Sequence, residues 1–289
     1  MFVEAIETVS GFTRPLHSII RLKDNKIIPG SATLFFVNEN GFAVTCKHVA
    51  ETIGLSEAIN RKYTEFRQEV NSLSSIDRKE DLFNRYGYMD GAALQLKNSF
   101  VDCVDRFSEL NIIMHKHADL AIVQFIGFNQ IRYRGHAIFL KNGAEIRQGK
   151  FLCRLGYPFP EFNNFSYDSE RDDITWIQSG NPVSPRFPIE GMVTRHLAGP
   201  NGIYGIELST PGLRGQSGGP LFDEKGRVYG MQSSTSHLHL GFDLEEKEVL
   251  VNNISKRVSN HAFLHLGQCL HSDLIKNFLA ENNVEFYED

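Results

Sequence analysis

Short apolar or alternating runs bounded by turn residues make up most of the chain. Residues 31–37 (SATLFFV) and 42–46 flank an Asn40-Gly41 pair, which supplies the positive φ that a tight hairpin turn needs. Many short strands with frequent turns are typical of an all-β barrel or sandwich, and we expect that fold class. Further predicted strands are residues 92–97, 119–125, 136–141, 151–155, 174–178, 191–196, 203–209, 220–222 and 228–233.

Two segments follow a helical period instead. Residues 56–73 place apolar side chains at spacings of four, three, four and three, which trace one helix face, and Ser56 is the expected N-cap. Ser272 precedes a second amphipathic segment near the C-terminus, which we expect to pack over a sheet or a barrel end. The apolar positions are Ile59, Tyr63, Phe66, Val70 and Leu73 in the first segment and Leu274, Ile275, Phe278 and Leu279 in the second.

Three stretches carry no clear period. Residues 161–173 are polar and predict a loop, and three prolines between residues 182 and 188 predict an irregular connection. Residues 237–270 do not fit the strand pattern before them, and we expect an extra strand pair there, ahead of the last helix. We expect a boundary between two β-rich halves near residues 142–149.

Composition narrows the possible functions of this 289-residue chain. Acidic residues outnumber basic ones by 35 to 30, which argues against a nucleic-acid binder that works through bulk positive charge. A membrane-spanning helix needs about 20 apolar residues, and no run here approaches that length. The first residues lack the pattern of a secretory signal, and no CxxC motif is present, so we expect reduced thiols and a cytoplasmic protein. The cysteines are Cys46, Cys103, Cys153 and Cys269.

The strongest chemical signal is the segment GQSGGPL at residues 215–221. A serine hydroxyl is a poor nucleophile at neutral pH, and it needs a base to take its proton and donors to hold an oxyanion. The glycines around Ser217 suit a tight loop in which backbone N–H groups converge on one point. Taken alone, the segment could equally be a glycine-rich hairpin loop with an exposed serine.

Two further segments supply the groups that a nucleophilic serine needs. His48 lies in TCKHVA at the end of a predicted strand, where an imidazole could act as general base. Asp119 opens the apolar strand in HADLAIV, and a carboxylate there is costly to bury unless it is paired. Pairing with His48 would satisfy that carboxylate and fix the imidazole tautomer. Each residue alone could be structural, but His48, Asp119 and Ser217 in this order favour a catalytic site.

In these motifs and their order, the chain resembles chymotrypsin-fold (trypsin-like) serine proteases, and in particular intracellular bacterial trypsin-like peptidases. The resemblance implies that Ser217 is the nucleophile, His48 the general base and Asp119 the residue that orients His48. It also implies an oxyanion hole made by the backbone N–H groups of Gly215 and Ser217. The expected activity is that of a serine endopeptidase that cleaves protein or peptide substrates through an acyl-enzyme intermediate.

The resemblance also implies a mostly β fold of two antiparallel six-stranded barrels, with the site in the cleft between them. Residues 1–145 would form the first barrel, which carries the base and the acid and has an inserted helix at about residues 50–75. Residues 146–289 would form the second barrel, which carries the nucleophile and the C-terminal helix.

The primary substrate pocket would take its lining from the segment before the serine and from the strand after it. No acid stands at Pro211, so a preference for Arg or Lys at P1 is not expected. Polar side chains predict a polar or small P1 residue instead. The expected lining residues are Pro211, Gln232, Ser233 and Ser234.

Other chemistries have weaker support. Residues 115–117 and 237–239 are HxH pairs whose histidines share a strand face and could offer zinc ligands, but no CxxC or HExxH motif accompanies them. Cys46 lies two residues before His48, where it more readily packs inward than acts as a thiol nucleophile. No phosphate-binding glycine pattern is present, so we expect neither a metal nor an organic cofactor.

The alternative from a different functional class is a pseudoprotease that keeps the barrels and serves as a protein-binding module. A second alternative is a latent protease that an activating protein partner or effector switches on. The presence of all three expected catalytic residues favours an enzyme. The physiological substrate, the activating signal and the oligomeric state do not follow from the sequence.

Overall fold

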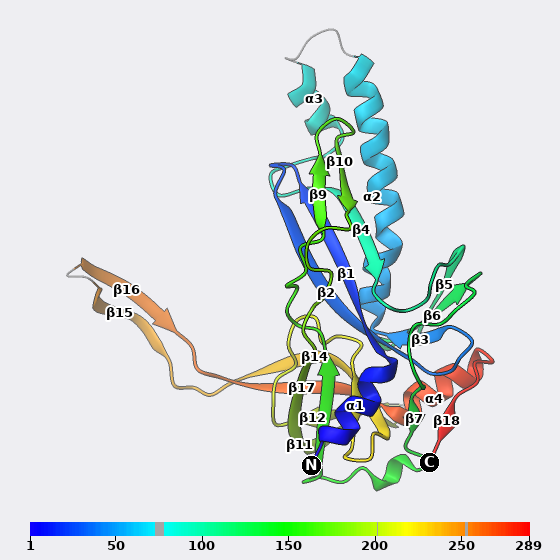
Figure 1. Cartoon of the computed structure of the whole chain (residues 1–289). Helices are drawn as coiled ribbons and strands as arrows, with labels where there is room; N and C mark the ends of the chain where they lie inside the picture. Colours follow the sequence, from blue (N-terminus) through cyan, green and yellow to red (C-terminus); the bar gives the residue numbers. More distant parts are fainter. Residues whose placement is uncertain (73–77, 201, 252–253) are drawn as a thin grey trace.

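The computed structural model describes residues 1–72, 78–200, 202–251 and 254–289. The molecule is mostly β, with two large sheets, a long helix that rises from one end, and a two-stranded arm that projects from the body (Figure 1). The expected mostly β fold class is therefore confirmed.

The first sheet has six antiparallel strands in the order β4-β1-β2-β3-β6-β5. Its β2 and β3 form the hairpin that the Asn40-Gly41 pair predicts, and Gly41 has the positive φ of +77°. The sheet is open, because its edge strands β4 and β5 do not pair with each other in the described part of the chain. The bounds are β1 (Thr13–Leu22), β2 (Ile27–Phe36), β3 (Phe42–Thr45), β4 (Ala93–Phe100), β5 (Glu109–Met114) and β6 (Ala121–Ile126).

The second sheet closes into a six-stranded barrel. Its strands run in the order β13-β8-β11-β12-β17-β14, and β13 pairs with both β8 and β14 to complete the ring. Two short strands extend this sheet beside β14, where β7 pairs in parallel with β14 and β18 pairs in parallel with β7. We expected an antiparallel sheet, and these two pairings differ from that expectation. The bounds are β7 (Ile138–Phe139), β8 (Phe151–Gly156), β11 (Phe187–Gly199), β12 (Gly202–Leu208), β13 (Pro220–Phe222), β14 (Val228–His239), β17 (Phe263–His271) and β18 (Tyr287–Glu288), with a 3₁₀ turn η1 at Gly143–Glu145.

Helix α2 (Lys47–Ser72) follows β3 directly and lies along β4, and the short α3 (Arg78–Arg85) comes next in the chain (Figure 1). The expected start at Ser56 is wrong, because Val49 and Ile53 already extend the apolar face into the main hydrophobic cluster. Ser56 lies inside the helix, where its hydroxyl donates to the carbonyl of Ile53. Leu73, the last apolar position of the predicted helix, lies outside the described residues.

The segment expected to be a loop, residues 161–173, contains β9 (Phe165–Asp168) and leads into β10 (Asp173–Trp176), with which β9 forms a hairpin. The prediction failed because the hairpin is stabilised by distant contacts: Phe162 and Ile174 bury their side chains with Ile19 of β1. Helix α1 (Val3–Phe12) and β1 were likewise absent from the predicted elements.

The C-terminal region carries the expected strand pair and helix. Strands β15 (Leu244–Val251) and β16 (Ile254–Asn260) form the projecting arm, and α4 (Ser272–Glu281) packs near β14 and β17. The cap of α4 is His271 rather than Ser272, since the His271 side chain accepts from the backbone N–H of Asp273.

One hydrophobic core joins the two sheets. Its largest cluster combines Phe35 and Val123 of the first sheet with Leu155 and Phe222 of the second. This shared core also includes Val44 and Cys46 at the end of β3, so it packs that end of the first sheet against the second. Among the described residues, no helix is both long enough and apolar enough to cross a membrane.

Candidate active site

His48 and Asp119 are joined by hydrogen bonds where α2 begins. His48 lies in the first turn of α2, and Asp119 lies just before β6. The Nδ1 of His48 is 3.0 Å from both carboxylate oxygens of Asp119, and the backbone N–H of His48 donates to Oδ1 over 3.0 Å. On its other side, the carboxylate accepts from the Ser233 hydroxyl of β14 over 2.6 Å. Because the carboxylate can only accept, Nδ1 carries the proton and Nε2 is left as the basic nitrogen.

These contacts determine the charges of the pair. Burial alone would raise the pKa of Asp119, but hydrogen bonds from His48 and Ser233 outweigh it and hold that pKa at about 2. The hydrogen bond from Asp119 raises the pKa of His48, although partial burial opposes the rise. Asp119 is therefore anionic at neutral pH, and His48 is a stronger base than a free imidazole.

Ser217 is carried by a tight loop between β12 and β13 whose backbone is fixed against β2. The backbone N–H of Thr33 donates to the carbonyl of Ser217 over 3.0 Å, and the Thr33 hydroxyl donates to the carbonyl of Gly215 over 2.7 Å. That hydroxyl also accepts from the backbone N–H of Tyr157 over 3.1 Å. Gly215 has φ +90°, and a Cβ there would lie 2.6 Å from the carbonyl oxygen of Tyr157, so only glycine fits.

The loop leaves polar groups free around Ser217. In the described part of the chain, the backbone N–H groups of Gly215 and Ser217 have no acceptor, and these are the two amides expected to form an oxyanion hole. The Ser217 hydroxyl and the Nε2 of His48 likewise have no hydrogen-bond partner among the described residues. His48, Gly215 and Ser217 line one cavity of about 260 Å³, so the fold brings these three residues to the same cleft.

The residues expected to bind substrate line a neighbouring cavity of about 560 Å³, which Ser217 also lines. They are Pro211, Gln232, Ser233 and Ser234. The hydroxyl of Ser233 is already used by Asp119, so this residue serves the His48–Asp119 pair as well as the cavity wall.

Thr33 is the contact residue that the sequence did not reveal. It stands 182 positions before Gly215, inside a run of residues typical of a strand. A threonine in a strand is ordinary, and only the approach of the loop gives its hydroxyl a role.

Cys46 has the environment of a structural thiol. It is fully buried, and its Sγ lies 3.2 Å from the carbonyl oxygen of Gln232. Burial raises the pKa of Cys46 well above its usual value, and the nearby Asp119 raises it further. Although Cys46, His48 and Asp119 have donor atoms within 4.8 Å of one another, a protonated thiol is a poor nucleophile and a poor metal ligand.

The two HxH pairs have different surroundings. His115 accepts through Nδ1 from the backbone N–H groups of His117 and Ala118, which makes it part of a turn. His239 lies at the base of the arm, where its ligand atom is within 4.8 Å of those of Asp243 and His261. Two imidazoles and one carboxylate are donors that suit zinc. They also contact one another directly, through a hydrogen bond between His239 and Asp243 and a distance of 3.3 Å from Nδ1 of His261 to the same carboxylate.

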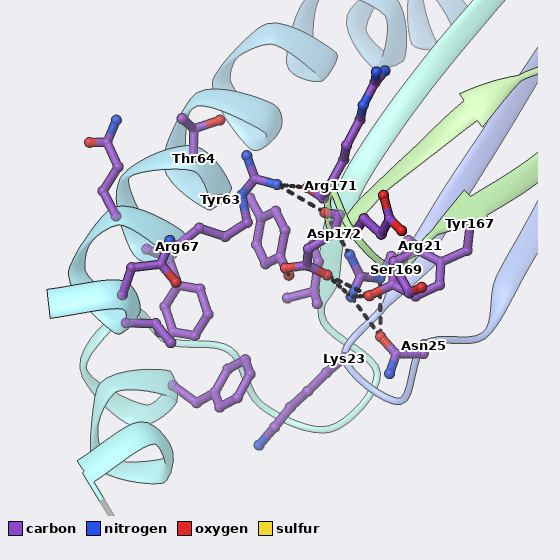
Figure 2. Close-up of a pocket in the computed structure, with 17 residues that line it drawn as sticks. Arg21, Lys23, Asn25, Tyr63, Thr64, Arg67, Tyr167, Ser169, Arg171 and Asp172 are labelled. Carbon is purple, nitrogen blue, oxygen red and sulfur yellow. Dashed lines mark hydrogen bonds and ion pairs between the residues drawn. The ribbon is translucent and has the colours of Figure 1, made fainter. Parts of the chain in front are cut away.

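A cavity of about 670 Å³ lies between α2 and the β9–β10 hairpin and is lined by none of the three expected catalytic residues (Figure 2). Arg21 pairs with Asp172 there over 2.6 Å, and the hydroxyls of Tyr63 and Tyr167 donate to the same carboxylate over 2.7 Å. Arg67 reaches the same corner and donates to the backbone carbonyls of residues 171 and 172. These contacts attach the inserted helix to the hairpin, which is a structural role.

Comparison with known proteins gives one family match. A family model described as a trypsin-like peptidase domain matches residues 31–231, which is more than half of the chain. No curated protein sequence matches this chain. Among solved structures, an HtrA-type protease with a tripeptide is similar with a TM-score of 0.49 and 11% identity, over 99% of this chain and 64% of that one. This chain thus spans less than two thirds of the length of that protein.

Proposed function

This chain belongs to the trypsin-like peptidase domain family, and we propose that it is a serine endopeptidase with Ser217, His48 and Asp119 as its catalytic residues. The observation that carries the proposal is the hydrogen-bonded His48–Asp119 pair, whose histidine lines the same cavity as Ser217. The family match supports a protease, and this arrangement supports the serine chemistry.

The reaction follows from the roles of these groups. The Ser217 Oγ attacks the carbonyl carbon of the scissile peptide bond, while Nε2 of His48 takes the hydroxyl proton. The oxyanion that forms accepts hydrogen bonds from the free N–H groups of Gly215 and Ser217. His48 then gives its proton to the leaving amine, which departs as the C–N bond breaks and leaves an acyl ester on Ser217. A water molecule then attacks the ester carbonyl while His48 takes its proton. The bond between the acyl carbon and Oγ of Ser217 breaks, His48 returns the proton to Oγ, and the carboxylic acid product is released.

Asp119 has an electrostatic and orienting role in this scheme. Its carboxylate stays ionised because its pKa is held at about 2, so it can stabilise the imidazolium that forms at His48. The Ser233 hydroxyl supports it from the second barrel. We further propose that the chain divides near residues 145 and 146, that a protein or peptide is the substrate, and that the protein works in a reducing compartment.

A fluorophosphonate probe tests the proposal most directly. We expect one covalent adduct on Ser217 by intact mass and peptide mapping, and none in Ser217→Ala or His48→Ala. Circular dichroism on all three proteins is the control for folding. An adduct that persists in Ser217→Ala would contradict the assignment.

A latent state is the second candidate, and one observation favours it. Neither the Ser217 hydroxyl nor His48 Nε2 has a hydrogen-bond partner in the described residues, so the nucleophile and the base are not joined at rest. Catalytic hydrogen bonds often close only when substrate binds. A folded protein that gives no adduct would indicate a latent protease awaiting a partner or effector, or a pseudoprotease that binds proteins.

A further inference from the structure

Arg154 on β8 is a completely buried arginine that has no counter-ion among the described residues. Its Nη1 donates to Oε1 of Gln232 over 2.7 Å, and its Nη2 donates to the carbonyl and hydroxyl oxygens of Thr210 over 3.0 and 2.6 Å. All of these acceptors are uncharged, and Nε has no hydrogen-bond partner in the described part of the chain. No carboxylate in the described part of the chain lies within 4.0 Å of the guanidinium, so its positive charge is uncompensated.

This guanidinium lies directly behind the substrate cavity beside Ser217. Gln232, which accepts from Nη1, lines that cavity, and Thr210 precedes the lining residue Pro211. A Cβ on Gly267 would lie 2.1 Å from Nη1, so glycine at this position is what leaves room for the guanidinium. The side chain of Gln232 therefore contacts both the guanidinium of Arg154 and the cavity.

The walls of the cavity add no negative charge. Its ionisable lining residues are Arg214, which is exposed, and the histidines His237 and His265. The Nδ1 atoms of these histidines lie 2.5 Å apart, so one imidazole donates its N–H to the other. Every ionisable group on the wall is therefore basic, and the buried charge behind Gln232 has the same sign.

We propose that this cavity binds an acidic P1 side chain, aspartate or glutamate, and that Arg154 is the residue that selects it; this rests on the proposed peptidase function. Burying a charge is costly, and an opposite charge in good geometry offsets much of that cost. The P1 carboxylate supplies the missing charge. When the Gln232 side chain turns aside, the carboxylate accepts the Nη1–H of Arg154 in place of a neutral amide oxygen.

The other classes of P1 residue fit this pocket less well. A lysine or arginine would bring a second positive charge toward Arg154, with no acid on the cavity wall to offset it. A small neutral residue would leave Arg154 as uncompensated as it is in the free protein. Gln232, Ser233 and Ser234 place polar side chains on the wall, and the buried guanidinium favours a charged ligand over a neutral one.

Matched substrates test the proposal. In a P1-diverse library of fluorogenic peptides, we expect Asp to exceed Asn, and Glu to exceed Gln, in kcat/KM by about 10- to 100-fold. That is the range of one hydrogen bond to a charged group. Each pair has the same shape and differs in charge, so equal rates within both pairs, or a preference for Lys and Arg, would overturn the proposal.

Gln232→Glu is the most direct variant, because it places a carboxylate of the same size against Arg154. The protein itself then supplies the negative charge that the P1 side chain would otherwise bring. We expect the acid-to-amide ratio of kcat/KM to fall by about tenfold or more. Lys225→Gln is the control, since it removes an exposed positive charge from the turn between β13 and β14, outside the cavity, and we expect the ratio to change by less than about threefold. An unchanged ratio in Gln232→Glu would mean that Arg154 does not select the substrate.

A binding measurement separates this proposal from the proposed catalysis. The same peptides, labelled and in amide form, are titrated into Ser217→Ala and followed by fluorescence anisotropy. Tighter binding of the acidic member of each pair would support the specificity even if the wild type gives no fluorophosphonate adduct. If the wild type gives the adduct but cleavage and binding both ignore the P1 charge, the specificity is refuted and the peptidase function stands. Equal binding with no adduct refutes the specificity and also shows that the free protein lacks an active serine.

Discussion

The Thr33 hydroxyl donates to the carbonyl oxygen of Gly215 over 2.7 Å, which joins a strand of the first sheet to the loop that carries Ser217. The same hydroxyl accepts from the backbone N–H of Tyr157, and the backbone N–H of Thr33 holds the carbonyl of Ser217. The N–H groups of Gly215 and Ser217, in contrast, have no acceptor among the residues that the structure describes. Thr33 is therefore a positioning residue for the proposed oxyanion hole.

We expect Thr33→Val to lower kcat/KM by about tenfold or more, mainly through kcat, because a displaced oxyanion donor is lost only in the transition state. Steady-state kinetics on a cleaved peptide gives the split between kcat and KM. Thr33→Ser keeps the hydroxyl and should restore most of the rate. A rise in KM alone would indicate a role in substrate binding instead.

Asp119→Asn should lower kcat by about 10⁴-fold while the protein remains folded, because an amide cannot hold His48 in the required tautomer or stabilise the imidazolium. Ser233→Ala removes one hydrogen bond to the same carboxylate and should lower kcat by about tenfold. Steady-state assays of peptide cleavage measure kcat for both variants, and thermal melts on the same samples check that they are folded. Near-wild-type turnover by Asp119→Asn would rule out this role for Asp119.

The pH dependence of kcat/KM should show a rising limb whose midpoint lies above 6.5. His48 must be neutral to accept a proton, and its bond to Asp119 raises its pKa, so the imidazole stays protonated to a higher pH than a free one. Asp119 itself titrates near 2 and leaves the limb unaffected. In Asp119→Asn the midpoint should move down, since the ion pair that raises the pKa is gone. A midpoint that stays in place would assign the limb to another group.

All four cysteines are free and buried. Burial raises the pKa of Cys153 and of Cys269 to about 12, so their thiolates are scarce at neutral pH. We expect no rapid reaction of the native protein with a disulfide reagent, and four reactive thiols after denaturation. Cys46→Ala should still give the fluorophosphonate adduct on Ser217, and loss of the adduct in a folded Cys46→Ala protein would point to thiol chemistry.

The inserted helix should depend on the pair between Arg21 and Asp172 (Figure 2). Asp172→Asn leaves the buried guanidinium of Arg21 without its carboxylate, and asparagine tolerates the φ of +49° at this position. We expect a loss of about 1–3 kcal/mol in the free energy of unfolding, below the range of a fully buried pair because the Asp172 side chain is 36% exposed. Urea unfolding of the wild type and of Asp172→Asn measures this difference in the free energy of unfolding.

Glu80→Gln is the control for that measurement. Its partner is Lys23, and the Glu80 side chain is 69% exposed, so the change should stay within about 0.5 kcal/mol. Equal losses in Asp172→Asn and Glu80→Gln would show that the Arg21–Asp172 pair has no special weight.

The sequence by itself determined the β-rich class, most strands of the two sheets, the C-terminal helix and the family. These rest on local signals: alternation with period two shows which side chains face a core, and residues 215–221 form a motif that does not depend on distant contacts. The hydrogen bond between His48 and Asp119 was also anticipated, because an acid at the start of an apolar strand needs a partner.

Only the tertiary structure decided what those residues meet. The β9–β10 hairpin exists because Phe162 and Ile174 pack on Ile19, and no local period encodes that contact. Thr33 gains its contact with Gly215 from a loop 182 positions away, and Arg154, ordinary in the sequence, becomes a buried charge beside the proposed substrate cavity. Short-range patterns fix which side chains are buried. Which buried groups contact each other depends on how whole sheets pack. That packing is set by many weak contacts between distant segments, so no single segment of the sequence predicts it.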